Sequence, residues 1–101
     1  MNFNLYDLRL FAVVAQHASF RRAAAEFGLA PSSVSHTIRA MEETLGARLF
    51  NRTTRSVALT EAGGRFLSRI KPALVELDAA MSDMGVEEVT ACMGLFLSKK
   101  I

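Results

Sequence analysis

Residues 19–39 read SFRRAAAEFGLAPSSVSHTIR, and residues 48–59 read RLFNRTTRSVAL. The first stretch contains two helix signals around a short turn. Ser19 is a good N-cap, Gly28 favours a helix end, and Pro31 favours the start of the next helix. The second stretch has two short apolar runs on either side of a polar, arginine-bearing segment, which indicates a hairpin. This order of elements predicts a helix-turn-helix followed by a wing.

The second helix of such a unit enters the major groove of DNA. Here it is expected over residues 31–45, before Gly46. A buried stripe is predicted from positions that recur every three or four residues, namely Val34, Ile38, Met41 and Leu45. The opposite side presents short hydrogen-bonding side chains and one arginine, namely Ser32, Ser35, His36 and Arg39. A helix that fits into a groove and reads base edges needs such a face.

Another helix is predicted before this unit, over residues 5–17, with Asn4 as its N-cap. Its expected apolar face consists of Leu5, Leu8, Phe11, Ala12, Val14 and Ala15.

The hairpin strands are expected at 49–50 and 57–59, with Arg52 and Arg55 in the loop between them. Thr60 then caps a long helix over 61–84, in which Pro72 is expected to cause a bend or to remove one hydrogen bond.

Positive charge is concentrated in the first part of the chain. The whole chain has a net charge of +2, but residues 1–60 contain seven arginines and four acidic residues, a net charge of +3. Residues 61–101 have a net charge of −1. Arginine suits bidentate recognition of phosphate or guanine. A solvated arginine-rich surface would explain the charge equally well, so charge alone does not decide the function.

Composition and spacing argue against several other classes. A chain of 101 residues is long enough for one domain with a modest core. The single cysteine, Cys92, cannot form an internal disulfide, which fits a reducing cytosol, and no apolar run approaches the roughly 20 residues that span a bilayer. Ser35 and His36 are neighbours and do not face each other on a helix. His17, His36 and Cys92 lack metal-ligand spacing, so no enzyme, metal or cofactor is expected.

Four linked segments resemble the N-terminal domain of LysR-type bacterial transcriptional regulators. They are AAAEFGL at 23–29, PSSVSHTIRAME at 31–42, LGARLFNRTTR at 45–55 and LTEAG at 59–63. The segments occur in the family's order without gaps, and the resemblance covers about residues 4–84. It implies a mainly α fold: a winged helix-turn-helix of three helices and a two-stranded wing at 1–60, then a linker helix at 61–84. Linker helices of this family pair antiparallel into dimers, which often assemble into tetramers on promoter DNA.

The resemblance also implies which residues meet DNA. The family's base-reading positions fall at the start of the recognition helix, and its wing contacts fall on residues 52–55. Together with the polar face, this gives nine expected DNA-binding residues: Pro31, Ser32, Ser33, Ser35, His36, Arg39, Arg52, Thr53 and Arg55. Many members have glutamine-proline at 31–32 and arginine at 36, so the operator sequence does not carry over to this chain.

The long helix carries a second apolar pattern at mostly three- and four-residue spacing, which is typical of helix–helix association. The expected dimerisation residues are Phe66, Ile70, Leu74, Leu77 and Met81. Packing onto the chain's own domain is the alternative. The length of the pattern favours a partner helix and therefore a homodimer, with tetramers as a further expectation.

Residues 85–101 show no helical or strand period and do not resemble the opening strand of the effector domain found in the family. No small-molecule effector site or membrane contact is therefore expected here. The sequence leaves open whether the chain is part of a longer protein, a truncated product or a stand-alone protein. The expected function is sequence-specific binding of double-stranded DNA for transcription regulation, in the bacterial cytoplasm with the nucleoid. The alternatives are a protein-assembly module without DNA affinity and a truncated subunit that pairs with a full-length relative.

Overall fold

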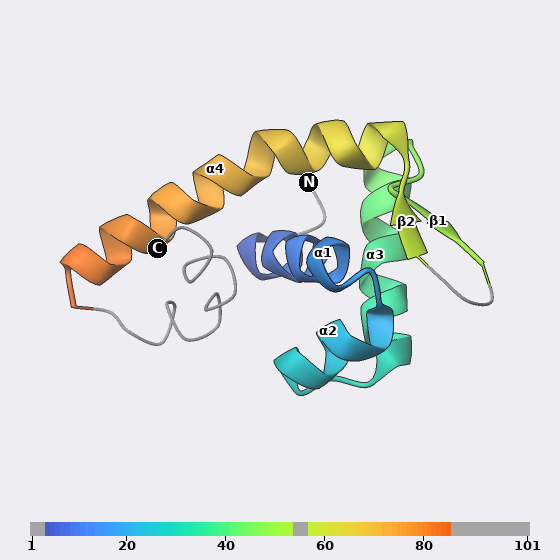
Figure 1. The fold of residues 1–101 in the computed structure, drawn as a ribbon, viewed down its shortest axis with the longest axis horizontal. Coiled ribbons are helices and arrows are strands. Elements are labelled where there is room, and N and C mark those ends of the chain that lie inside the picture. Colours follow the sequence, from blue (N-terminus) through green and yellow to red (C-terminus); the bar gives the residue numbers. More distant parts are fainter. Residues whose placement is uncertain (1–3, 54–56, 86–101) are drawn as a thin grey trace. The chain divides into compact units, whose positions relative to one another are not determined.

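A computed structural model describes residues 4–53 and 57–85 of the chain. Within them four helices and two short strands follow one another in the order α1, α2, α3, β1, β2, α4 (Figure 1). The chain divides into two units, residues 1–67 and 68–101, and α4 begins in the first unit and continues into the second. The first unit contains the three short helices and the hairpin. It extends past the expected boundary at residue 60 because the first turns of α4 pack with it.

The three short helices begin and end where the sequence predicts. α1 spans Leu5–His17 and begins with a reciprocal cap, in which Asp7 N–H donates to Asn4 Oδ1 (3.0 Å) and Asn4 N–H donates to Asp7 Oδ2 (3.3 Å). α2 spans Phe20–Phe27, where Ser19 Oγ accepts from the third residue of the helix. α3 spans Pro31–Leu45 with proline at its first position. The expected helix ends are therefore confirmed.

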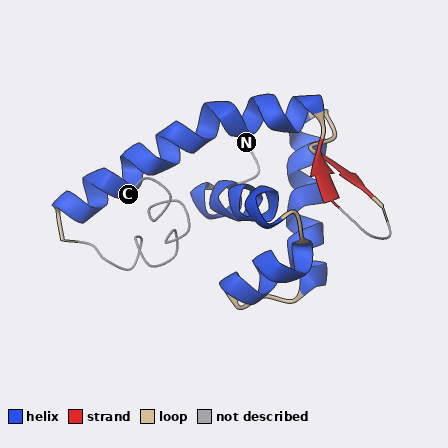
Figure 2. Cartoon of the chain, in the orientation of Figure 1, coloured by secondary structure: helices blue, strands red, loops and turns tan. Residues whose placement is uncertain are grey.

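α1 forms the centre of the core. Phe11, Ala12 and Val14 of its predicted apolar face are buried, but the rest of that face differs from the prediction. Leu10 and Val13 are buried, whereas Leu5 is 41% exposed and Leu8 and Ala15 are only half-buried. The helix contacts both α2 and α3, which lie beside it in Figure 2. Because it is covered from more than one side, its buried residues are not confined to one stripe.

The hairpin consists of β1 (Phe50–Arg52) and β2 (Val57–Leu59), paired antiparallel with Phe50 opposite Leu59 and Arg52 opposite Val57. The predicted strands are confirmed, but β1 begins one residue later and extends to Arg52. Arg52 therefore lies in a strand, where pairing with Val57 continues the ladder, and not in the loop. Arg55 falls among residues 54–56, which lie outside the described residues.

α4 spans Glu61–Asp83, one residue short of the prediction, and continues through Pro72. Thr60 caps it as expected: its Oγ1 accepts from Gly63 N–H (2.9 Å) and donates to the carbonyl oxygen of Arg48 (2.6 Å). Gly63 is buried so closely against the hairpin that a Cβ there would overlap the carbonyl oxygen of Leu49. A glycine is therefore required where α4 crosses the start of the wing.

Candidate nucleic-acid interface

α3 has one buried side and one exposed side. Val34, Ile38 and Met41 are buried as predicted, but Leu45 is 38% exposed, and Glu42 takes the buried position at the end of the stripe. Leu45 is the last residue of the helix, beyond the reach of the core. The exposed side carries five of the nine expected DNA-binding residues, namely Pro31, Ser32, Ser33, His36 and Arg39, and Ser35 is half-buried beside them.

The start of α3 offers a hydrogen-bond donor. Its N-cap is Ala30, which has no side-chain cap, and the Ala30 carbonyl oxygen accepts from Ser33 N–H (3.0 Å) and Val34 N–H (3.3 Å). Within the described residues nothing accepts from the N–H of Ser32. An exposed helix start with a free N–H and the positive end of the helix dipole attracts anionic groups such as phosphate.

The side chain of Arg52 turns from β1 toward α2 and α3. Its guanidinium carbon lies 4.7 Å from the centre of the Phe20 ring, Nη1 donates to Ser35 Oγ (3.3 Å), and Nη2 lies 3.7 Å from Glu42 Oε1. The side chain is 21% exposed, and its Nε and Nη2 atoms are inaccessible to solvent. Arg52 therefore joins the wing to the recognition helix, and little of its guanidinium is left to face a ligand.

Glu42 fastens the end of α3 to the start of the hairpin. Its Oε2 atom accepts from the backbone N–H groups of Leu49 (2.8 Å) and Phe50 (3.3 Å), and its side chain is only 9% exposed. Hydrogen bonds to an ionised carboxylate are stronger than neutral ones. Glu42 thus holds the chain reversal between helix and wing, and it forms an ion pair with Arg52.

Three arginines lie close enough to influence one another. Burial lowers the pKa of the Arg52 guanidinium, the carboxylate of Glu42 raises it, and the positive charges of Arg39 and Arg48 lower it. Arginine nevertheless stays protonated in proteins. Arg39 and Arg48 are exposed, so this side of the unit presents positive charge to solvent.

The remaining expected DNA-binding residues are placed less fully. Thr53 is exposed directly after β1, and Arg55 lies outside the described residues. Phe20 and Glu42, which hold Arg52, are not among the site residues predicted from the sequence. Glu42 did carry a signal, because it follows Ile38 by four residues and therefore places a charged residue on the apolar stripe of α3.

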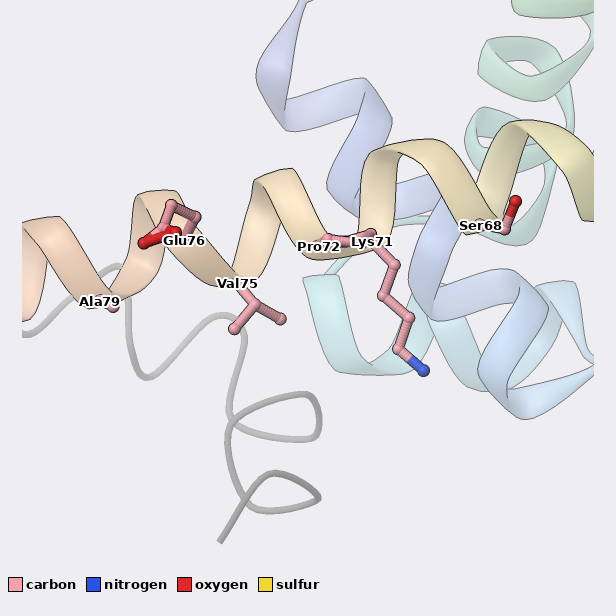
Figure 3. Close-up of a pocket in the computed structure, with 6 residues that line it drawn as sticks. All are labelled: Ser68, Lys71, Pro72, Val75, Glu76 and Ala79. Atoms are coloured by element: carbon pink, nitrogen blue, oxygen red, sulfur yellow. The ribbon is translucent and has the colours of Figure 1, made fainter.

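The predicted apolar seam of α4 is partly covered within a single chain. Leu74 is only 2% exposed, whereas Phe66, Ile70, Leu77 and Met81 are half-buried. Phe66 belongs to the first unit, where its ring centre lies 5.4 Å from that of Phe11. A neighbouring side of α4 is open instead and lines a pocket (Figure 3) formed by Ser68, Lys71, Pro72, Val75, Glu76 and Ala79.

Other kinds of site find little support in the described part of the chain. Residues 4–53 and 57–85 contain no group of three His, Cys, Asp or Glu side chains arranged to hold a metal ion. No helix in these ranges has the length and apolar character needed to cross a membrane.

The polar face of α3, the hairpin beside it and the order of the helices match a known family. The sequence model described as "Bacterial regulatory helix-turn-helix protein, lysR family" matches residues 5–64. The chain belongs to this LysR family. Two relatives from Escherichia coli strain K12 are the HTH-type transcriptional regulator PgrR, 50% identical over 78 residues, and the uncharacterized HTH-type transcriptional regulator YcaN, 46% identical over 84 residues. These matches cover 77% and 83% of this chain but only 26% and 28% of those LysR-family relatives.

Solved structures of the LysR family share the fold. The DNA-binding domain of BenM, in its complex with catB site 1 DNA, aligns with a TM-score of 0.76 and 31% identity over 82% of this chain and 93% of that one. The full-length Vibrio cholerae virulence activator AphB aligns with a TM-score of 0.75 and 32% identity, over 81% of this chain and 28% of that one. The family's winged helix-turn-helix is therefore the fold of this chain.

Proposed function

We propose that this chain binds double-stranded DNA in a sequence-specific manner and serves transcription regulation in the bacterial cytoplasm. The observation that carries the proposal is the two-sided character of α3, which buries Val34, Ile38 and Met41 and exposes a polar side beginning at the helix start. A helix with such a side fits the major groove. The likeness to the BenM domain, whose structure is a DNA complex, supports the same function.

The exposed residues of α3 divide into two proposed roles. Ser32, with its free N–H at the helix start, suits a phosphate oxygen, and Pro31 and Ser33 lie beside it. Ser35, His36 and Arg39 lie further along the helix and suit base edges. Hydrogen bonds to base edges carry sequence information, whereas phosphate contacts fix orientation.

Beyond β1, Thr53 and Arg55 suit the phosphate backbone or the minor groove. Arg52 remains among the expected DNA-binding residues by the family resemblance, but its guanidinium contacts Phe20 and Ser35, which suits an indirect role.

Pairing of two chains through α4 is the second part of the proposal. Two copies related by a two-fold axis would recognise a roughly palindromic site, with a spacing that follows from the dimer. Leu74 is already buried in a single chain, so we assign the contact to the open side that carries Pro72, Val75 and Ala79. The functional division then follows the sequence, with residues 1–60 reading DNA and 61–84 pairing chains.

The experiment that tests the function is selection of preferred sites from random duplex DNA, followed by affinity measurements at two salt concentrations. We expect a two-fold motif and a steep loss of affinity with salt. Arg55→Ala should weaken binding to all sequences and reduce the salt slope by about one unit if the side chain contacts a phosphate. Arg69→Ala is the matched control, because Arg69 is an exposed arginine outside the nine expected residues. Weak binding without a preferred motif would favour a protein-assembly role instead.

A further inference from the structure

Arg52 and Ser35 connect the two elements that are expected to meet DNA. Arg52 belongs to β1 and Ser35 to α3, and the guanidinium Nη1 donates to the serine Oγ at 3.3 Å. We propose that Arg52 is a positioning residue that fixes Ser35 as a hydrogen-bond donor toward a base edge, so that the protein discriminates against cytosine at the base that Ser35 meets. This inference rests on the proposed function, because it concerns which bases the same interface reads.

The chemistry of the serine hydroxyl limits what it offers. A hydroxyl has one O–H donor and two acceptor lone pairs, and its hydrogen rotates to suit its surroundings. Arg52 can only donate, so it occupies a lone pair of Ser35 and never competes for the hydrogen. Within the described residues nothing accepts from the Ser35 hydroxyl, which is half-buried at the edge of the exposed side of α3. The hydrogen is therefore directed toward the ligand, and a nearby positive charge disfavours the reverse arrangement.

Arg52 is held firmly enough to act in this way. Its guanidinium lies over the Phe20 ring at 4.7 Å, and its Nη2 lies 3.7 Å from the Glu42 carboxylate. Its backbone is paired with Val57 in the hairpin. The Nε and Nη2 atoms are inaccessible in this conformation and Nη1 donates to Ser35, so Arg52 acts on base reading through Ser35.

The consequence for sequence preference follows from the major-groove edges of the bases. Guanine offers the acceptors O6 and N7, adenine offers N7 and thymine offers O4, whereas cytosine offers the donor N4–H₂. A serine held as a donor bonds to the first three bases. Accepting from cytosine would use its second lone pair, bring the N4–H₂ donor beside the Arg52 guanidinium and leave the serine O–H without an acceptor, so cytosine is disfavoured. A serine free of Arg52 could rotate and accept from cytosine as well. Through Ser35, Arg52 would thus narrow the base preference at one position of the DNA site.

The test measures binding of the full chain to duplexes that carry each of the four bases at every position of the selected site. The variants are Ser35→Ala, Arg52→Met, Arg52→Lys and the double variant Ser35→Ala/Arg52→Met, with Arg69→Gln as the control for loss of one positive charge. Arg52→Lys keeps the charge but not the planar, forked guanidinium. Thermal unfolding followed by circular dichroism verifies that each variant is folded at the assay temperature. Glu42 retains its two backbone donors in all of them.

We expect the wild-type chain to disfavour cytosine at one position of each half-site by about 5- to 150-fold, the usual cost of one mismatched base pair. Ser35→Ala, Arg52→Met and Arg52→Lys should each reduce this discrimination at the same position. Arg52→Met should add no further change there once Ser35 is alanine. Arg69→Gln should leave the discrimination intact.

Two results would overturn the inference while leaving the proposed function in place. One is an unchanged cytosine discrimination in Ser35→Ala, which can be read even if the Arg52 variants unfold. The other is a loss of affinity in Arg52→Met that is equal on every sequence, which would make Arg52 a general support of the wing. Binding by the wild-type chain without any base preference would instead overturn the proposed function itself.

Discussion

The close contact between α4 and the hairpin predicts that replacing two adjacent glycines by alanine has opposite effects on the free energy of unfolding. A Cβ on Gly63 would overlap the carbonyl oxygen of Leu49 and come within 3.0 Å of Leu59 Cδ2, whereas a Cβ on Gly64 would meet nothing within 4 Å. Both glycines lie in a helix, where alanine is more favourable than glycine by up to about 1 kcal/mol. Gly64→Ala should therefore raise the free energy of unfolding by up to about 1 kcal/mol.

Gly63→Ala should lower the free energy of unfolding, because the added methyl group meets backbone that cannot rotate away. The Leu49 carbonyl also accepts from Thr60 N–H at 3.0 Å, so displacing it disturbs the start of α4. Overpacking of this kind costs about 1–3 kcal/mol. The helix preference for alanine is common to both variants, so the two should differ by the overpacking cost of about 1–3 kcal/mol, or roughly 4–24 °C in Tm for a domain of this size.

Thermal and urea unfolding of both variants, followed by the helical circular-dichroism signal, would measure this difference. A shift of both variants in the same direction, or free energies of unfolding within about 0.5 kcal/mol of each other, would refute the close packing of α4 against the wing.

Three further predictions concern α3 and α4. Glu42→Gln should lower the free energy of unfolding in urea by about 2 kcal/mol, because two charge-assisted hydrogen bonds become weaker neutral ones. The control Glu43→Gln, at an exposed neighbouring position, should change it by less than about 0.5 kcal/mol. His36→Ala should relax discrimination at one or two base positions in site selection, and an equal loss on every sequence would argue against a base contact. Leu74→Asp should destabilise the single chain because it buries an unpaired charge. Val75→Asp should leave the unfolding of each chain nearly unchanged and convert dimers to monomers in analytical ultracentrifugation. A dimer that survives Val75→Asp would place the interface elsewhere.

The sequence predicts the helices well because their ends are determined by local chemistry. Asn4 and Ser19 cap helix starts through hydrogen bonds to residues three positions later, and Gly28 and Gly46 adopt the left-handed conformation that ends a helix. Such contacts involve near neighbours in the chain, so a single sequence contains the whole signal. The expected bounds of α1 and α3 agree with the structure for the same reason.

The sequence predicts the direction of side chains less well, because that depends on residues far apart in the chain. The sequence neighbours of Arg52 predict that it lies in a loop, but the orientation of its side chain depends on Phe20, Ser35 and Glu42. The seam of α4 shows a related limit. The spacing that includes Leu74 predicts a buried side, which is confirmed for Leu74, but the spacing does not say whether the same chain or a partner covers it.

The bonds from Glu42 to the backbone of Leu49 and Phe50 also bear on the kinetics of recognition. They close the chain between α3 and β1 into a short ring and so restrict movement between the two elements. A protein whose contact elements are already arranged has little to reorganise at encounter, so its association rate should vary little from one operator to another. Differences between good and poor sites would then appear as differences in residence time on the DNA.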